Sequence, residues 1–212
     1  MSEQKSNKNP VLAFLRLDSN KMIQWTVGGA IIGIISYLLF SQLKLPTYNF
    51  TGLDLGIIVI PINGGINLGL VIIALVAAFC GPLAGFVVGF FGTLGFDLLF
   101  YNQLIALGTL NLAFGLLGFI IGIPRYTDNE GFTDGKKLGK LMLFSLAGYL
   151  VMTILYLIGL IVIANQSFEG TLLYNFTPYF SITLISLFIF APVFVRIADI
   201  VIKEGIELKG ES

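Results

Sequence analysis

The chain has 212 residues, of which 56% are hydrophobic and 11% are charged, and its mean hydropathy is +0.92. Soluble globular domains carry about 25% charged residues, so this composition excludes an ordinary soluble fold and indicates an integral membrane protein. Twelve basic and twelve acidic residues cancel and histidine is absent, so we expect no nucleic-acid partner, no metal site, no cofactor and no enzyme activity.

Uncharged stretches divide the chain into segments of transmembrane length. A helix needs about 20 apolar residues to cross the hydrocarbon core of a bilayer. The stretch 55–96 is long enough for two helices and should break at Gly81-Pro82, because proline fits the first turn of a helix better than its interior. We predict an all-α integral membrane protein, a single six-helix domain over 1–212, with helices near 22–41, 64–80, 82–101, 106–123, 139–164 and 178–202.

The distribution of lysine and arginine predicts the orientation of these helices. Four basic residues precede the first helix, four lie between the fourth and fifth helices, and three follow or end the sixth. Lys44 alone lies on the opposite side. Cytoplasmic loops carry the excess of basic residues, so we expect a multi-pass protein of the cell (plasma) membrane with both termini in the cytoplasm.

The first predicted helix carries Gly29 and Gly33, four residues apart on one face. Small residues let two helices approach closely in lipid. Two interpretations remain open here: the glycines pack against other helices of the chain, or they form an outward face for a partner helix. The glycines of the third and fourth predicted helices are expected to pack within the chain.

The first outer loop, 42–65, is long and partly apolar. Its run of Ile57, Ile58, Val59 and Ile60 is too short to span a membrane, and Pro61 with the following Asn and Gly residues opposes a smooth entry into the next helix. Irregular backbone is tolerated at membrane depth where it is buried in protein or lines a cavity. We predict a loop that is partly folded in over the helices as a lid, the alternative being an interfacial loop without a ligand.

Polar and aromatic residues gather toward the predicted outer ends of the helices, where they are costly unless they have a function. Each one alone can be an interfacial residue, since tyrosines form belts at both membrane surfaces. Together they offer aromatic faces with amide and hydroxyl groups, which suits a planar heterocycle. The candidate substrate-binding residues are Asp54, Asn63, Asp97, Tyr101, Asn111, Tyr156, Asn165, Tyr174 and Tyr179.

Three segments resemble a known family. The segment from Ala74 to Phe100 reads ALVAAFCGPLAGFVVGFFGTLGFDLLF, with a GPLAGxxxGxxG pattern followed by an acidic residue. The segments LGTLNLAFGLLGFIIG from Leu107 and FAPVFVRIADIVIK from Phe190 are similar to the family's fourth and sixth helices. The chain resembles the substrate-binding S component of energy-coupling factor (ECF) vitamin transporters, although the family's first helix usually has AxxxA where this chain has Gly29 and Gly33.

The resemblance implies a high-affinity subunit that captures a vitamin or related small molecule from outside. Its implied partners are this substrate, membrane lipid, a transmembrane coupling subunit and two cytoplasmic ATPases, with Gly29 and Gly33 as the docking face for the coupling subunit. A six-span structural or assembly protein without a ligand is the alternative, and a membrane enzyme is a third. The site would lie between the first loop and the fourth to sixth helices.

The charged residues of the predicted outer half narrow the range of expected substrates. The outer half offers Lys44 as its cation, against Asp54, Asp97 and Glu169, so an anionic ligand would bury its charge without a fixed side-chain partner. We therefore expect a neutral or cationic substrate. A ring stacked on tyrosine and hydrogen-bonded by Asn111 fits riboflavin, a thiamine-like or a pyridoxine-like compound, with riboflavin first among them.

Overall fold

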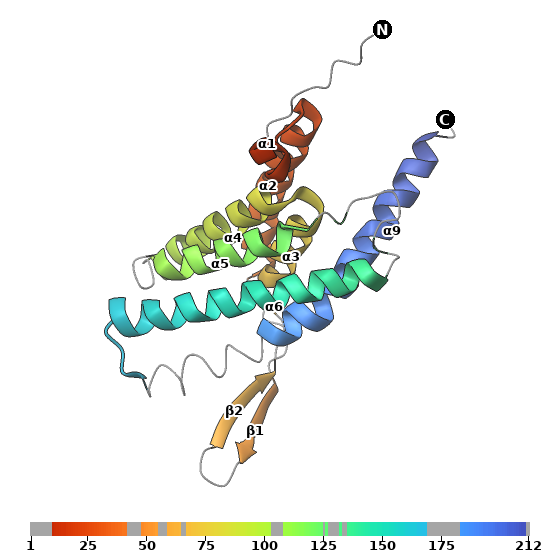
Figure 1. Cartoon of the computed structure of the whole chain (residues 1–212). Helices are drawn as coiled ribbons and strands as arrows, with labels where there is room; N and C mark the ends of the chain where they lie inside the picture. The colour runs from red at the N-terminus through yellow and green to blue at the C-terminus, as the bar shows by residue number, and fades with distance from the viewer. Residues whose placement is uncertain are drawn as a thin grey trace.

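A computed structural model describes residues 10–41, 48–54, 59–64, 67–102, 108–124, 126, 132, 135–168 and 183–210. Helices make up most of this part of the chain (Figure 1). The elements are α1 (Pro10–Phe14), α2 (Asn20–Phe40), β1 (Tyr48–Asp54), β2 (Val59–Gly64), α3 (Leu68–Cys80), α4 (Pro82–Phe96), α5 (Thr109–Gly122), α6 (Gly135–Ile158) and α9 (Ala191–Gly210), with π-helical turns η1 (Asp97–Tyr101), η4 (Gly159–Ile163) and η6 (Ser186–Phe190).

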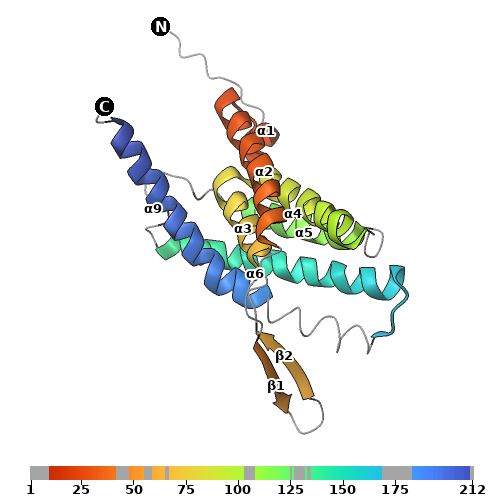
Figure 2. The same ribbon diagram turned by 180° about the vertical axis from the view of Figure 1, so that it is seen from behind.

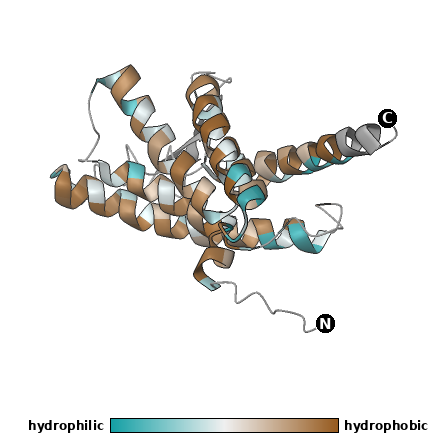
Figure 3. Cartoon of the chain, turned by 90° about the horizontal axis from the view of Figure 1, so that it is seen from above, coloured by the Kyte–Doolittle hydropathy of each residue, from teal (hydrophilic) through white to brown (hydrophobic). Residues whose placement is uncertain are grey.

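Four helical segments are long and apolar enough to cross a membrane: Asn20–Phe40, Pro82–Tyr101, Gly135–Ile163 and Thr183–Lys203. The apolar helices α3 and α5 are shorter, with 13 and 14 residues. Large apolar side chains also cover the outer faces of the long helices, among them Ile32 and Leu143, and brown dominates the helices in Figure 3. A helix that is apolar on all sides is typical of a membrane span, so the structure agrees with a membrane protein.

The break between α3 and α4 lies at Gly81 and Pro82. Gly81 has a φ of 97°, a conformation that favours glycine, and Pro82 occupies the first turn of α4, where its missing N–H is no loss. At the other end of α3, the side chain of Asn67 accepts a hydrogen bond from the N–H of Leu70 at 3.3 Å and caps the helix. The sequence therefore sets both ends of α3 by local chemistry.

Glycines bring α4 and α5 into backbone contact. A Cβ added to Gly85 would collide with the carbonyl group of Gly118, and one added to Gly89 would collide with that of Phe114. Backbone atoms cannot move aside as a flexible side chain can, so these positions require glycine at this helix separation. The prediction that the glycines of these two helices pack within the chain is confirmed.

Gly29 and Gly33, predicted as a docking face, also face other helices of the chain. A Cβ on Gly29 would meet the side chain of Cys80, and one on Gly33 would meet Val76 and Val88. The helix α2 therefore turns its small-residue stripe toward α3 and α4, because these two helices supply the close contact that the glycines permit. Of the two interpretations left open by the sequence, packing within the chain is the one that the structure favours.

The first outer loop forms a hairpin. Strands β1 and β2 pair antiparallel, with Tyr48 opposite Gly64 and Asp54 opposite Val59, and the register is irregular between Phe50 and Leu53. The hairpin extends away from the helices in Figures 1 and 2, so the prediction that this segment folds in over them is wrong for the described strands. The backbone N–H and C=O groups pair across the hairpin, which removes the need to bury them against the helices.

The side chain of Arg16 joins α3 and α5 at one end of the bundle, called here the Arg16 end. Its side chain is 4% exposed. Its Nη1 donates to the carbonyl oxygen of Phe79 at 2.9 Å and its Nη2 to that of Pro124 at 3.2 Å, so one guanidinium caps the ends of α3 and α5. The hydroxyl of Thr26 on α2 donates to the carbonyl oxygen of Cys80 at 3.3 Å. A cation at helix C-termini is stabilised by the helix dipoles and the last carbonyl groups.

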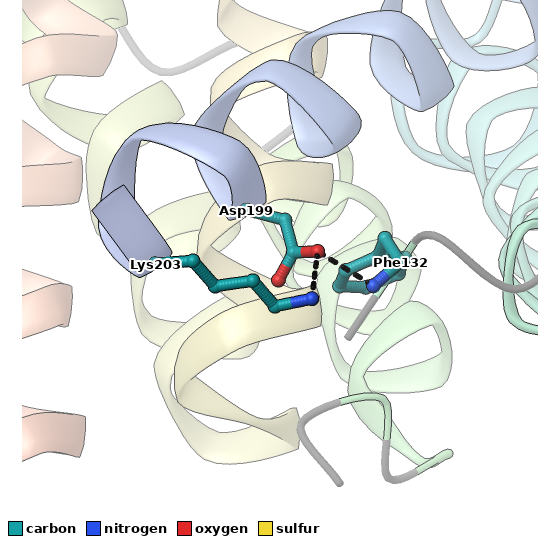
Figure 4. Close-up of polar contacts among 3 residues, drawn as sticks. All are labelled: Phe132, Asp199 and Lys203. Carbon is teal, nitrogen blue, oxygen red and sulfur yellow. Dashed lines mark hydrogen bonds and ion pairs between the residues drawn. The ribbon is translucent and has the colours of Figure 1, made fainter. Parts of the chain in front are cut away.

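An aromatic cluster and an ion pair complete the Arg16 end. The ring of Phe132 packs against that of Phe79, at a centroid distance of 5.4 Å, and against that of Tyr126, at 5.3 Å. Asp199 on α9 accepts a hydrogen bond from the N–H of Phe132 at 2.8 Å and pairs with Lys203 at 3.1 Å (Figure 4). Burial raises the pKa of Tyr126, so the phenol stays protonated and donates to a carbonyl oxygen of α5 at 2.9 Å.

Candidate binding pocket

A cavity of about 310 Å³ lies at the end of the bundle opposite Arg16. Its walls come from the last turns of α2, the start of α3, the end of α4 with η1, the start of α5, and α6. Aromatic and apolar side chains alternate there with a few hydroxyl, amide and carboxyl groups, a composition typical of small-molecule sites. The described lining residues are Tyr37, Ser41, Asn67, Thr93, Phe96, Asp97, Tyr101, Leu110, Asn111, Phe114 and Tyr156.

The cavity brings together four of the predicted site residues, Asp97, Tyr101, Asn111 and Tyr156, from three different helical segments. Asn165 is not among its lining residues: it follows η4 with an exposed side chain and a φ of 53°. The backbone of Asp54 and Asn63 lies in β1 and β2, while their side chains lie outside the described part, as do Tyr174 and Tyr179 entirely.

A buried hydrogen-bond network forms the inner wall of the cavity. The hydroxyl of Thr93 donates to the carbonyl oxygen of Gly89 at 2.7 Å. The side-chain amide of Asn111 donates from Nδ2 to Thr93 Oγ1 at 3.2 Å and to Asp97 Oδ2 at 2.9 Å. Asn111 is fully buried and Asp97 is 8% exposed. The neutral amide of Asn111 therefore holds the carboxyl group of Asp97 in place, and Thr93 fixes the amide.

The opposite wall supplies hydroxyl and amide groups. Tyr37 in the last turn of α2 and Ser41, the residue that caps this helix, both line the cavity. Asn67 uses its Oδ1 to cap α3 and its backbone N–H to bond Ser186 Oγ at 2.8 Å. Its Nδ2 is left as a donor at the cavity wall, since the capping bond occupies the amide oxygen.

The electrostatics of the cavity are simple. Asp97 is the one charged residue among the lining residues described, so the wall offers a carboxyl group and no cation. A buried anion without a fixed positive partner is unfavourable, so the site disfavours anionic ligands. No group of three or more histidine, cysteine or acidic side chains that could hold a metal ion occurs in the described part of the chain.

One π-helical turn lines the cavity, and another contacts a residue that lines it. η1 contains Asp97 and Tyr101, η4 continues α6 beyond Tyr156, and η6 contains Ser186, the partner of Asn67. Single π-helical turns are rare and frequently occur at functional sites, because they change the direction of side chains within a helix.

Several lining residues were not predicted from the sequence, although the spacing of two of them could have indicated their position. Thr93 lies four residues before Asp97, so helical spacing puts both on one face of α4. Tyr37 lies four residues after Gly33 and continues the inward stripe of α2, which becomes evident only once the direction of that stripe is known. Asn67 reads as a helix cap, and nothing in the sequence marks it as a pocket residue.

Comparison with family models gave a match to the ECF-type riboflavin transporter, S component, over residues 16–201. This match covers most of the chain, from Arg16 to the middle of α9. No curated protein and no solved structure matched the chain.

Proposed function

We propose a function from the premise that this chain belongs to the ECF-type riboflavin transporter S component family: it binds a flavin in the cavity between α2, α4, α5 and α6 for uptake into the cell. Membership makes the chain a transporter subunit for a vitamin-type substrate rather than a member of an enzyme family. The observation that carries the proposal is the cavity itself, with aromatic walls, amide and hydroxyl groups and no cation among its described lining residues.

The size and charge of the cavity support a neutral heterocycle as the substrate. About 310 Å³ lies at the lower end of the range for small-molecule pockets. Tyr101, Phe96 and Phe114 offer ring faces, on which an isoalloxazine can stack. We therefore propose riboflavin rather than a carboxylate-bearing vitamin, with Asp97, Tyr101, Asn111 and Tyr156 as substrate-binding residues.

The lengths of the helices support a six-span arrangement in which the cavity is a recess. At 1.5 Å per residue, α3 and α5 are about 20 Å long, whereas α2 is about 30 Å long. The Arg16 contacts hold α3 and α5 together at one end, so their shortness leaves space at the other end, beside Asn67 and Asn111. We place this recess on the outer side of the cell membrane and both termini in the cytoplasm, because basic residues are concentrated on the side of the termini.

Transport requires further subunits. We propose that the chain works with a transmembrane coupling subunit and two ATPases, the partners that its resemblance to ECF S components implies. Because Gly29 and Gly33 are occupied by contacts with α3 and α4, docking should involve the outward apolar faces of the helices rather than these glycines.

Ligand extraction from the purified protein tests the proposal. The full chain is purified in detergent without added vitamins, denatured, and the released small molecules are identified by mass spectrometry. We expect a flavin near one equivalent, and binding of added riboflavin to the stripped protein by quenching of flavin fluorescence.

A panel of thiamine, pyridoxine and pantothenate serves as the comparison in the same assay. Tight binding of pantothenate would contradict the charge argument. A folded protein that binds none of the four compounds would favour a structural role instead.

A further inference from the structure

The orientation of the Asn111 side chain is determined by its neighbours. Thr93 uses its hydroxyl proton toward the carbonyl oxygen of Gly89, so its oxygen is left as an acceptor. Asp97 Oδ2 is the second neighbour of the amide. Both neighbours accept hydrogen bonds, so the Nδ2 group with its two hydrogens must face them, and the amide oxygen must face the other way.

Asn111 is fully buried, and this arrangement leaves its Oδ1 without a hydrogen-bond partner among the described residues. The oxygen lies near the start of α5, because a Cβ added to Gly108 would be 3.5 Å from it. Asn111 lines the cavity. A buried acceptor without a donor is unfavourable, so ligand binding is favoured when the ligand supplies a hydrogen-bond donor at this point.

We infer that Asn111 Oδ1 accepts a hydrogen bond from a ring N–H of the bound ligand and thereby selects heterocycles that carry an N–H donor. The inference rests on the proposed function, since in riboflavin it assigns this contact to N3–H, the single N–H of the isoalloxazine ring. Thr93 and Asp97 act as positioning residues, because they keep the amide oxygen directed at the ligand.

The groups around Asn111 favour this edge of the flavin over other parts of it. The N3–H of riboflavin lies between two ring carbonyl groups, so this edge offers one donor flanked by acceptors. Asn111 Oδ1 matches the donor, and the Nδ2 of Asn67 is available for a carbonyl group. A carbonyl edge presented directly to Asn111 Oδ1 or Asp97 would bring acceptors together and would be repulsive.

Methylation of the ligand tests the inference. Dissociation constants for riboflavin and N3-methylriboflavin are measured by fluorescence quenching with the wild-type chain, Asn111→Ala and Ser145→Ala. Ser145 is a matched control, because its buried hydroxyl also has no partner among the described residues but does not line the cavity. We expect methylation to weaken binding at least tenfold in the wild type and in Ser145→Ala, and to have less than a threefold effect in Asn111→Ala.

The outcomes separate this inference from the proposed function. No binding of riboflavin by the folded wild type would overturn both. Tight binding with no penalty for methylation, or an equal penalty in Asn111→Ala, would overturn the N–H assignment while leaving flavin binding intact.

Lumiflavin, which lacks the ribityl hydroxyls, separates a ring contact from a side-chain contact. If Asn111→Ala weakens riboflavin but not lumiflavin, Asn111 contacts a ribityl hydroxyl and the inference is wrong. Thr93→Val covers the case in which Asn111→Ala does not fold, since it keeps Asn111 and removes one positioning contact. It should reduce the penalty for methylation without abolishing it.

Discussion

The two ends of the helix bundle differ in how their buried polar groups are hydrogen-bonded. At the Arg16 end, a buried guanidinium donates to carbonyl oxygens at the ends of α3 and α5, and Asp199 joins Phe132 to α9. At the cavity end, the amide oxygen of Asn111 has no protein partner in the described structure, and π-helical turns replace regular helix. The same helices run between both ends, so the contrast lies in how their termini are capped.

This contrast indicates a division between stability and function. At the Arg16 end, hydrogen bonds between segments far apart in sequence fix the relative positions of α2, α3 and α5. The cavity end leaves groups unsatisfied, which costs stability and prepares the site to gain free energy from a ligand. Substitutions at the Arg16 end should therefore lower stability, whereas substitutions in the cavity should lower affinity.

The largest effect on stability is expected at Gly33, where α2 packs against α3 and α4. Gly33→Leu would push a side chain against Val76 and Val88, and the glycine helps to set the separation of α2 from α3 and α4. We expect a loss of at least about 3 kcal/mol or failure to fold, since overpacking at helix contacts cannot relax fully. Gly28→Leu is the matched control, because a Cβ there meets nothing within 4 Å. Equal expression and melting of the two variants in detergent would contradict the inward stripe.

The next largest effect is expected from Arg16→Ala. This change removes two charge-assisted hydrogen bonds and leaves two carbonyl groups at the ends of α3 and α5 with fewer donors. We expect a loss of about 2–4 kcal/mol in the free energy of unfolding, with the affinity of the folded fraction for riboflavin unchanged. Arg196→Ala, at an exposed position on α9, should change stability by less than about 0.5 kcal/mol. Thermal unfolding in detergent, with riboflavin binding of the folded fraction, checks both statements.

At the cavity end, Asp97→Ala should separate affinity from stability. The change removes one acceptor that orients Asn111, so the amide oxygen is less firmly directed at the ligand. We expect riboflavin affinity to fall about tenfold, which corresponds to about 1.4 kcal/mol. The melting temperature without ligand should stay equal or rise, because a carboxyl group in a membrane span is costly. A fall in melting temperature with unchanged affinity would place Asp97 among the stabilising residues instead.

The smallest effect is expected from Asp199→Asn. The amide oxygen of asparagine can still accept the hydrogen bond from the N–H of Phe132, so only the attraction to Lys203 is lost. Lys203 is 40% exposed, and such partly exposed pairs contribute about 0–1 kcal/mol. Asp199→Ala removes both contacts and should cost more. Denaturation of the two variants in the same detergent measures the difference, and equal losses would mean that the hydrogen bond to Phe132 contributes little.

Much of this protein could be predicted from its sequence, because hydropathy, helix caps and helix breakers act locally. Helices overlap all six predicted ranges, and the break falls at Gly81 and Pro82 because a positive φ and a missing N–H are properties of those two residues. Asp97 and Asn111 were recognised as candidates because polar groups within apolar spans are conspicuous. The resemblance to ECF S components rested on the same glycine-rich segments that the family match includes.

The direction in which each helix face points was decided only by the tertiary structure. Gly29 and Gly33 turn toward α3 and α4, Arg16 reaches inward to cap two helices, and the exposed Asn165 does not line the cavity. In a soluble helix the polar side marks the surface. In lipid the outer and inner faces are equally apolar, so hydropathy locates a span but cannot tell which of its residues meet another helix. The amide orientation of Asn111 depends in the same way on Thr93 and Asp97, which reach it only when α4 and α5 pack together at their glycines.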